Sequence, residues 1–361
     1  MKKHGWETTG FFFANRLFGK KRPFQVSFQT TTACNLDCLY CYAEAGEKRD
    51  NELNTQEAKH LFKDLKKMGV YVLVLTGGEP LLRPDLDELI QFCAREGLHC
   101  SLATNGLLLT RDRALKLKEL GLNRFHFSLD GSNEEINSRF RKKGFFAGIL
   151  RGLDSAVSTR LPVSVQTMIT RNNIDDLENI GKLLLENNVS VWRMQFIVPC
   201  GRGIALSLQE RFNREETLRL IEKVYVLSER NKGRIKIDFH ALQAYKVFLY
   251  KKAKFNLWQR LILRLKGGCG AIEGTVIYIN SDGSVRPCPH FPFELPGVNV
   301  KRHSVIDIYR NNPILRSLRE KNNLKGACRE CKYLFCCGGC RAKAFALTGD
   351  FFAADTSCPF D

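Results

Sequence analysis

Short apolar runs alternate with longer amphipathic runs along most of the chain, and this alternation repeats six times. The short runs have the length of buried strands, whereas the longer runs place apolar residues at helical spacing. Repeated strand–helix pairs imply right-handed crossovers and a parallel sheet. The predicted strands are 24–30, 71–76, 99–104, 123–128, 162–168 and 190–197. The predicted helices lie near 54–68, 84–96, 110–119, 144–159, 172–187 and 213–230.

Six strand–helix units are too few to close a TIM barrel. The pattern therefore predicts an α/β fold built on an open, partial (β/α)6 TIM-like barrel. Loops at the carboxyl ends of its strands would share one active face. Residues at the helix ends support this register. Asn54 and Glu57 form a capping pair that opens the first helix, and Gly69 closes it. Pro84 suits the start of the second helix.

The composition divides the chain into four segments. Residues 1–23 carry aromatic and basic clusters and are predicted to form an N-terminal arm, while residues 24–235 form the barrel. Residues 236–266 are predicted to be connecting basic amphipathic helices, with contact to a membrane or nucleic acid as the alternative. Residues 267–361 are rich in cysteine and poor in long helices, which predicts a separate domain.

Composition sets the expected compartment and partners. The 361 residues contain no run as long as a membrane span and no signal-peptide pattern, so we expect a cytoplasmic protein. Its 14 cysteines should then be reduced and available to metals rather than to disulfides. Two of them, Cys93 and Cys100, follow the core pattern and are predicted to be buried structural thiols. The net charge of +18 indicates either solvated basic faces or an acidic partner, such as a polycarboxylate, an acidic peptide, RNA or anionic lipid.

The residues that most clearly indicate a cofactor site lie in two loops, which follow the first and the second predicted strand. Cys34, Cys38 and Cys41 are spaced by three and then two residues, so they can hold three irons of a four-iron cluster and leave one iron open to a small molecule. The same thiols could form most of a zinc site. The second loop, 76–80, reads Thr-Gly-Gly-Glu-Pro and lies on the same face. Its glycines permit close backbone approach to a ligand, and Glu79 offers a carboxylate to a cationic group.

With these two loops the sequence resembles the radical S-adenosylmethionine (SAM) superfamily, from about Phe24 to the end of the chain. In that family the open iron of a [4Fe-4S] cluster binds the amino and carboxylate groups of SAM. An electron from the reduced cluster, supplied by a flavodoxin- or ferredoxin-type donor, then produces a 5′-deoxyadenosyl radical that takes a hydrogen atom from the substrate. The resemblance implies that the cluster is bound by Cys34, Cys38 and Cys41, that the adenine is bordered by Tyr40, and that the amino group is received by Gly77, Gly78 and Glu79.

Five further residues lie at strand ends on the same face. Asn105, Ser128, Gln166 and Arg202 are candidates for contacts with the ribose or carboxylate of SAM, with ordinary turn chemistry as the alternative. Cys200 is a candidate substrate contact or hydrogen donor. Its alternative role is that of an unreactive loop thiol.

The C-terminal cysteines resemble the SPASM extension of radical SAM enzymes, which binds auxiliary clusters. Their two Cys-x-x-Cys pairs lie too close together for a zinc ribbon. The resemblance implies one or two auxiliary [4Fe-4S] clusters, the first bound by Cys328, Cys331, Cys337 and Cys358 and the second by Cys269, Cys288 and Cys340. A fourth ligand of the second set is missing, since Thr275 stands near its place; an open iron, His290 as ligand, or no cluster are the alternatives. Cys336 is an alternative to Cys337.

The stretch 338–350 is similar both to haem and haem d1 biosynthesis enzymes and to maturases of pyrroloquinoline quinone and mycofactocin. A basic protein suits a tetrapyrrole polycarboxylate as well as an acidic peptide. The arm of 23 residues is short for a leader-recognition domain, which favours oxidative modification of a tetrapyrrole side chain over crosslinking, epimerisation or oxidation of a peptide. A basic iron–sulfur protein that binds RNA or peripherally contacts a membrane is the alternative from another class. It is less favoured, because a purely structural cluster does not require Glu79 and its glycines.

Overall fold

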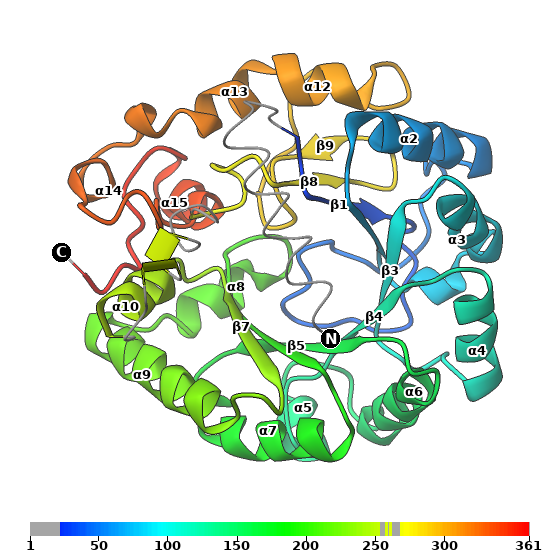
Figure 1. Ribbon diagram of the computed structural model, residues 1–361, viewed down its shortest axis with the longest axis horizontal. Coiled ribbons are helices and arrows are strands. Elements are labelled where there is room, and N and C mark those ends of the chain that lie inside the picture. The colour runs from blue at the N-terminus through cyan, green and yellow to red at the C-terminus, as the bar shows by residue number, and fades with distance from the viewer. Residues whose placement is uncertain (1–21, 253–256, 259, 262–267, 361) are drawn as a thin grey trace.

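A computed structural model describes residues 22–252, 257–258, 260–261 and 268–360. The predicted N-terminal arm, apart from its last two residues, and most of 253–267 lie outside the described residues. The described chain folds around one nine-stranded sheet of strand order β7-β6-β5-β4-β3-β2-β1-β8-β9. The sheet curves into an open barrel with helices around its outer side (Figure 1). The predicted α/β class and partial barrel are confirmed.

The six predicted parallel strands are all present, each within two residues of its predicted bounds. Adjacent strands from β1 to β6 pair in parallel, as repeated strand–helix units require. The strands are β1 Gln25–Gln29, β2 Val72–Thr76, β3 His99–Thr104, β4 Arg124–Ser128, β5 Val163–Ile169, β6 Val191–Phe196, β7 Lys236–His240, β8 Val276–Ile279 and β9 Val285–Arg286.

Two features at the sheet edges differ from the sequence-based expectation. The segment 236–266, predicted to be helical, begins with strand β7, which pairs in parallel with β6. Its sequence, Lys-Ile-Asp-Phe-His, alternates in polarity over only five residues, so the edge of β6 supplies the hydrogen bonds that stabilise it. At the other edge β8 pairs in parallel with β1, so the sheet continues across the predicted domain boundary at residue 267.

The helices cover the outer side of the sheet, and the caps of α2 match the sequence signals, whereas Pro84 lies just before Asp85, the N-cap of α3. Asn54 and Glu57 form a complete capping box, and Gly69 ends α2 in the left-handed conformation at φ 77°. The helices are α2 Thr55–Met68, α3 Leu86–Arg95, α4 Arg111–Glu119, α5 Glu134–Asn137, α6 Phe146–Ser158, α7 Leu177–Glu186, α8 Gly203–Gln209, α9 Arg214–Arg230, α10 Ala244–Lys252, α12 Val305–Asn311, α13 Pro313–Arg319, α14 Ala327–Glu330 and α15 Arg341–Thr348.

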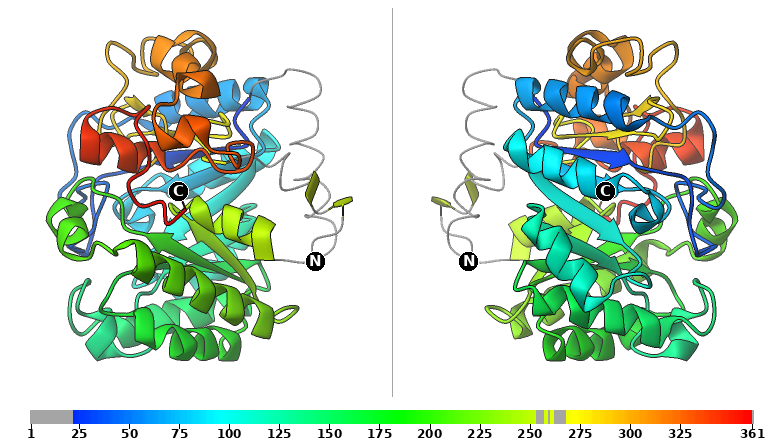
Figure 2. Two further views of the ribbon diagram at one scale, coloured as in Figure 1. Left: turned by 90° about the vertical axis from the view of Figure 1, so that its left-hand side faces the viewer. Right: turned by 90° about the vertical axis from the view of Figure 1, so that its right-hand side faces the viewer.

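The C-terminal part lies across the opening between the two sheet edges (Figures 1 and 2). On one side β8 joins β1, and α12 packs against α2. On the other side the Lys343 ammonium donates to the carbonyl oxygen of Ala241 at 3.2 Å, just after β7. The cysteine-rich segment is therefore fastened to both edges of the barrel.

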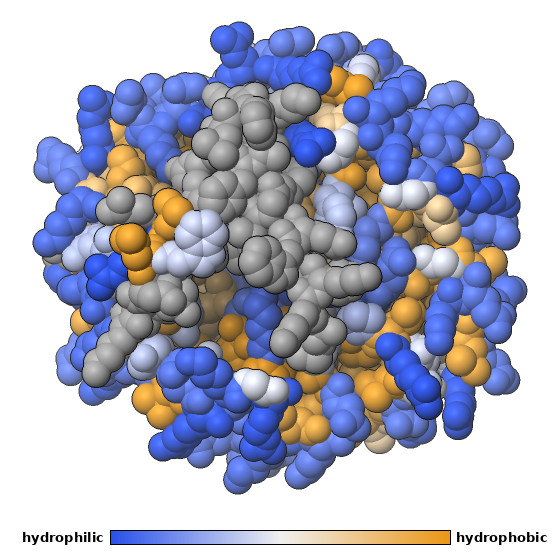
Figure 3. All heavy atoms as spheres, in the orientation of Figure 1, coloured by the Kyte–Doolittle hydropathy of each residue, from blue (hydrophilic) through white to orange (hydrophobic). Residues whose placement is uncertain are grey.

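Apolar side chains on the outer face of the strands and the inner face of the helices form one continuous core. Cys93 and Cys100 belong to it and are fully buried, which confirms their predicted structural role. On the face seen in Figure 1, hydrophilic residues surround the periphery and hydrophobic residues show mainly nearer the middle (Figure 3). None of the helices in the described residues is long and apolar enough to cross a membrane.

Candidate functional site

The first cysteine loop leaves β1 and folds back against its own start. Ala33 and Gly46 form an isolated bridge, and the Cys34 amide donates to the carbonyl oxygen of Gly46 at 2.8 Å. The Leu36 amide points at the Cys34 sulfur at 3.4 Å. All three predicted cluster ligands, Cys34, Cys38 and Cys41, are half-buried in this loop.

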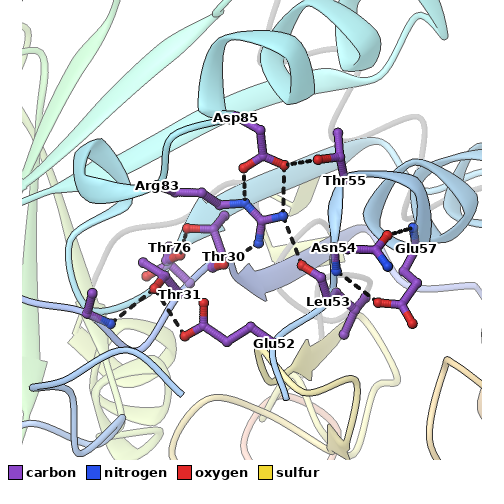
Figure 4. Close-up of polar contacts among 11 residues, drawn as sticks. Thr30, Thr31, Glu52, Leu53, Asn54, Thr55, Glu57, Thr76, Arg83 and Asp85 are labelled. Carbon is purple, nitrogen blue, oxygen red and sulfur yellow. Dashed lines mark hydrogen bonds and ion pairs between the residues drawn. The ribbon is translucent and has the colours of Figure 1, made fainter. Parts of the chain in front are cut away.

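A polar framework fixes the ends of that loop to the neighbouring strand (Figure 4). Arg83, paired with Asp85 at 2.6 Å, donates to the carbonyl oxygens of Thr30 and Leu53. One oxygen of Glu52 accepts from the Thr31 hydroxyl at 3.1 Å, and also from the amide and hydroxyl of Thr32. These buried and partly buried, charge-assisted contacts fix the position of the loop.

The glycine turn that follows β2 packs directly on the cysteine loop. The Gly78 amide donates to the carbonyl oxygen of Thr31 at 2.8 Å, and the Glu79 amide donates to that of Ala33 at 2.7 Å. A Cβ atom on Gly78 would overlap the Ala33 carbonyl, and one on Gly77 would come within 2.7 Å of the Thr31 oxygen. The glycines are therefore required for contact between the two loops, a role that we did not predict beside their role toward a ligand.

Glu79 lies beneath the cysteine loop, and its side chain is fully buried. Its carboxylate accepts from the Thr104 hydroxyl at 2.7 Å and from the Asn105 amide at 2.8 Å. Burial raises the pKa of Glu79 to about 7, and these hydrogen bonds offset only part of that effect. A cationic ligand group placed beside it would restore the charged form.

Tyr40 belongs to a buried network that sequence reasoning missed. Its hydroxyl contacts both the Asp130 carboxylate and the Arg141 guanidinium. Arg141 pairs with Asp130 at 2.7 Å, and its Nη1 lies 3.9 Å from the Cys38 sulfur. Burial disfavours the charged guanidinium, but Asp130, Tyr40 and Cys38 outweigh it and raise the pKa of Arg141. The signal was available in part, because Asp130 follows β4 directly on the active face.

The interior of the barrel brings two of the predicted SAM contacts beside two residues that we did not single out. Ser128, Gln166, Arg193 and Asp238 follow one another in register across β4 to β7. Their sequence neighbours form the outer core, so these four side chains face the interior. The Arg193 Nε atom is buried, and within the described residues it has no hydrogen-bond partner. A buried donor without a partner inside the barrel fits a hydrogen-bond acceptor of a ligand.

Arg202 and Asn105 both brace the cysteine loop. Arg202 donates to the carbonyl oxygens of Cys38 at 3.1 Å and Ala45 at 2.6 Å, and Asn105 donates to the Asn35 side chain at 2.7 Å. Both side chains are thus engaged with protein atoms, and their predicted contacts with SAM stay predictions. Neighbouring Cys200 is buried, and burial raises its pKa to about 12, so it remains a protonated thiol.

Four C-terminal cysteines surround one cavity of about 220 Å³. They are Cys328, Cys331, Cys337 and Cys358, the set that the resemblance assigns to one auxiliary cluster. Backbone amides point at three of the sulfurs, each at 3.4 Å, from Asp355, Tyr333 and Gly339 to Cys328, Cys331 and Cys337 respectively. Amide donors aimed at sulfur stabilise thiolates, so the cavity fits a four-iron cluster.

Cys336 lies outside this cavity. Its thiol donates to the Tyr333 carbonyl oxygen at 3.4 Å, so its sulfur is turned toward a backbone acceptor. The Cys337 sulfur instead accepts from an amide and lines the cavity. The geometry therefore favours Cys337 as ligand.

The second predicted set is also brought together. Burial raises the pKa of Cys288, and the nearby thiols of Cys269 and Cys340 add to the effect. His290 packs its ring against Tyr42 at a centroid distance of 5.2 Å, and burial lowers the pKa of His290 to about 4, so it remains neutral. A neutral imidazole is the form that binds metal, so His290 stays a candidate for the missing fourth ligand.

Buried cations compensate for negative charge at these thiols. Arg341 is fully buried, and its Nη2 lies 3.7 Å from the Cys328 sulfur. Lys343 is also buried, and its charge lowers the pKa of Cys340. Burial has the larger, opposite effect, so the pKa of Cys340 is raised to about 12. Buried cations are costly unless negative charge lies nearby, so their presence beside the sulfurs fits thiolate clusters that carry negative charge. Across the described ranges no three His, Cys, Asp or Glu side chains converge as the ligands of a single ion do. A four-iron cluster differs, since each of its thiolates binds its own iron.

A partial barrel with a cysteine loop on its carboxyl face and a cysteine-lined cavity at its opening defines an iron–sulfur enzyme. The radical SAM superfamily model matches residues 28–184, and the iron–sulfur cluster-binding SPASM model matches residues 269–332. The AdoMet-dependent heme synthase of Methanosarcina barkeri is 31% identical and aligns over 93% of this chain and 96% of its own length. The PqqA peptide cyclase of Bradyrhizobium diazoefficiens is 29% identical and aligns over 93% of this chain and 86% of its own length.

The fold agrees with these matches. The crystal structure of Streptococcus suis SuiB bound to precursor peptide SuiA matches 96% of this chain and 78% of that one, with a TM-score of 0.77 at 15% identity. The chain belongs to the radical SAM superfamily and carries a SPASM domain. It is therefore a radical SAM enzyme whose cofactors are a [4Fe-4S] cluster, SAM and one or two auxiliary [4Fe-4S] clusters.

We expect Gly78→Ala to separate the two loops, because its new Cβ would overlap the Ala33 carbonyl. The free energy of unfolding should fall by about 3 kcal/mol, and the variant should lose the iron of the first cluster. Gly46→Ala is the matched control, since a Cβ there meets open space; it should change stability by less than about 0.5 kcal/mol. Urea denaturation and iron analysis measure both effects. Equal iron content in the two variants would contradict the packing role of Gly78.

The two neighbouring cysteines give a second test. Cys337→Ser should remove about four iron atoms, because its sulfur lines the cavity, whereas Cys336→Ser should retain them. Iron and sulfide analysis after anaerobic reconstitution compares the two variants. If only Cys336→Ser lost iron, Cys336 and not Cys337 would be the ligand.

The buried Glu79 carboxyl should make the apoprotein less stable at high pH. Its folded pKa of about 7 exceeds the ordinary value of 4.5, so its neutral form is favoured in the fold. The stability associated with that proton is complete below about pH 4.5 and is lost as pH rises through 7, by about 3 kcal/mol. Glu79→Gln should lack this loss when urea unfolding is compared at pH 5 and pH 8. Identical pH dependence in both proteins would show that Glu79 is ionised throughout.

Proposed function

We propose that this enzyme oxidatively modifies a side chain of a tetrapyrrole. The observation that carries the proposal is the similarity to the AdoMet-dependent heme synthase, which extends over 96% of that protein's length. The net charge of +18 suits a substrate that carries several carboxylates. The protein works in the cytoplasm, where its 14 cysteines stay reduced.

Some residues of the active face hold the cluster, and others bind and orient SAM. Cys34, Cys38 and Cys41 hold the first cluster, and Glu79 receives the amino group of SAM. When bound, the reduced cluster supplies the electron that cleaves SAM to a radical able to take a hydrogen atom from the substrate. Ser128, Gln166 and Arg193 offer donors to the carboxylate or ribose from inside the barrel. Because Glu79 is buried beneath the cysteine loop, bulk water is kept from this salt bridge.

A second cavity suits an acidic group of the substrate. It measures about 300 Å³ and lies in the connection between α8 and α9, next to the C-terminal segment. Guanidinium groups bind carboxylates through paired donors, and hydroxyl groups add further donors. The lining residues are Arg211, Phe212, Asn213, Arg214, Thr217, Thr356, Ser357 and Cys358. Because Cys358 also belongs to the cysteine cavity, a carboxylate held here would lie next to the auxiliary cluster.

Maturation of a ribosomally made peptide is the second candidate function. It is favoured by the similarity to the PqqA peptide cyclase and by the shared fold of SuiB, whose structure contains a precursor peptide. An acidic peptide would use the same basic surface. Binding of RNA or of a membrane surface as the main function is less favoured, because Glu79 and its glycines form a cofactor site that such a role does not need.

The reductant is proposed to be an acidic flavodoxin- or ferredoxin-type protein that docks beside the cysteine loop. Leu39, within the loop, is 54% exposed, and its amide donates to the Phe140 carbonyl oxygen at 3.0 Å. Phe140 is followed, after Arg141, by the exposed Lys142 and Lys143. An exposed leucine beside basic residues, one position from a cluster ligand, suits a negatively charged electron carrier.

The reaction class is tested by anaerobic reconstitution with SAM and dithionite. The wild-type protein should form 5′-deoxyadenosine, and a porphyrin with carboxylate side chains should stimulate that formation. A Cys34/Cys38/Cys41 triple alanine variant should form none, while it retains about eight iron atoms, or about four if only one auxiliary cluster exists. Stimulation by a peptide but not by porphyrins would support the second candidate. No 5′-deoxyadenosine with intact clusters would refute both.

The docking surface is tested by Leu39→Glu. This change places a negative charge against the acidic carrier, so the rate of cluster reduction by reduced flavodoxin should fall about tenfold or more and depend on salt. Reduction by dithionite should be unchanged, because that small reductant needs no docking surface. Stopped-flow absorbance measures both rates. A parallel loss with both reductants would show that the substitution damages the cluster instead.

A further inference from the structure

The second auxiliary set, formed by Cys269, Cys288 and Cys340, lacks a fourth ligand. These thiols lie close together, since burial raises the pKa of Cys288 and the other two raise it further. Each iron of a four-iron cluster takes one thiolate, so three cysteines leave one iron open. Thr275, which stands near the place of the fourth cysteine, offers only a hydroxyl group. A fourth thiolate must therefore come from another part of the chain.

Cys200 is a buried thiol in the loop that follows β6. Its side chain is 2% exposed, and within the described residues its sulfur has no hydrogen-bond partner. The thiol of Cys336, which is also buried, instead donates to the Tyr333 carbonyl oxygen at 3.4 Å. A buried cysteine by itself is usually an ordinary core residue. The surroundings of Cys200 therefore decide what its sulfur can bind.

On one side the loop that carries Cys200 packs directly on the first cysteine loop. Gly201 adopts the left-handed conformation at φ 53°, and a Cβ atom there would come within 2.5 Å of the Cys41 carbonyl oxygen. The same oxygen accepts from the Arg202 amide at 3.1 Å. The Gly203 amide closes the turn by donating to the Cys200 carbonyl oxygen at 3.1 Å. These backbone contacts fix the position of Cys200 at the mouth of the barrel.

On the other side the same loop meets the C-terminal segment. Pro199 lines a small cavity together with Lys343 of α15. The Lys343 ammonium also lies 5.2 Å from the centre of the Phe196 ring, at the end of β6. Cys340 is the N-cap of α15. The residue before Cys200 is therefore next to the helix that begins at a ligand of the second set.

A third contact leads to the loop of Cys288. A Cβ atom on Gly201 would come within 2.9 Å of the Tyr42 carbonyl oxygen, and the Tyr42 ring packs against His290 at a centroid distance of 5.2 Å. His290 follows Cys288 by two positions, inside a turn in which the Phe291 amide donates to the Cys288 carbonyl oxygen at 3.1 Å. The loop of Cys200 thus lies between the first cysteine loop and two ligands of the second set.

The thiols also act on one another. Burial raises the pKa of Cys200, and the thiols of Cys340 and Cys41 raise it further. The Cys200 thiol in turn adds to the raised pKa of Cys288. These mutual effects agree with the three packing contacts, and together they group Cys200 with the second set.

We propose that Cys200 is the fourth ligand of the cluster bound by Cys269, Cys288 and Cys340. On binding, the Cys200 thiol releases its proton, and its sulfur forms a bond with the iron that the other three cysteines leave open. The pKa of about 12 in the metal-free protein does not oppose this, since Cys340 has the same value. Arg286, which lowers the pKa of Cys200 against the larger effect of burial, places positive charge beside the new thiolate.

A complete ligand set has two consequences. The second cluster then has no open iron, so a substrate does not bind to it through the metal, and Cys200 has no hydrogen atom to donate to a substrate radical. The cluster also joins the loop after β6 to the C-terminal segment. Its assembly therefore requires the barrel and that segment to be folded against each other.

The test uses the full-length Cys34/Cys38/Cys41 triple alanine variant, in which only auxiliary clusters remain. After anaerobic reconstitution it should hold about eight iron atoms. Addition of Cys200→Ala should lower this to about seven, with the electron paramagnetic resonance signal of an oxidised three-iron cluster, or to about four if the whole cluster is lost. In the same background Cys336→Ala and His290→Ala should retain about eight.

A serine variant separates ligation from packing. The serine oxygen can bind iron, so Cys200→Ser should retain more iron than Cys200→Ala, with an altered resonance spectrum of the reduced cluster. A thiol that only fills space predicts the reverse order. In that case alanine would be tolerated, whereas a buried hydroxyl group without an acceptor would be costly.

About eight iron atoms and an unchanged spectrum in Cys200→Ala would overturn the inference. About four iron atoms in the parent triple variant would overturn it too, because the second set would then bind no cluster. Loss of iron from His290→Ala but not from Cys200→Ala would overturn it in favour of His290. None of these measurements uses a substrate, so the inference can fail while the proposed function stands.

Discussion

The site depends on one backbone contact, where the glycine turn after β2 lies against the carbonyl groups that lead into the cysteine loop. No side chain fits between Gly78 and Ala33, so the two loops share a single position. Arg83 and Glu52 fix the outer ends of the same arrangement, and Glu79 is held beneath it by Thr104 and Asn105. Because these groups are buried or partly buried and hydrogen-bonded to the backbone, the geometry of the open iron is set by the fold and not by flexible side chains.

Charge balance is the second organising constraint. Burial raises the pKa of most of the thiols in both cysteine-rich regions, and a buried thiol binds metal only as a thiolate. Positive groups placed beside the sulfurs reduce that cost, and the protein uses Arg141, Arg341 and Lys343 for this purpose. Cluster binding and the folding of the C-terminal segment should therefore stabilise each other, since each supplies the charge that the other lacks.

Features that depend on neighbouring residues, such as strands and cysteine spacing, could be predicted from the sequence. Most features that depend on contacts between distant residues could not. Periodicity placed the six parallel strands, and the spacing of Cys34, Cys38 and Cys41 beside Gly77–Glu79 indicated the chemistry. Strand β7 was missed because its stability comes from pairing with β6 and not from its own five residues. The contact between Arg141 and Cys38 joins residues 103 positions apart, so no local pattern could reveal it. The choice between Cys336 and Cys337 likewise needed the directions of their sulfurs.

The pairing of β1 with β8 also has a consequence for synthesis on the ribosome. Gln25 lies beside Val276, so about three quarters of the chain must emerge before the second edge of β1 is covered. Until then the strand that carries the cysteine loop exposes unpaired backbone groups on that side, which invites association with other chains. Iron that reached the protein before β8 had emerged would encounter a cysteine loop whose strand is paired with β2 alone. Slow translation of the segment before β8 would prolong that interval, so the timing of metal delivery relative to chain completion becomes part of how this enzyme matures.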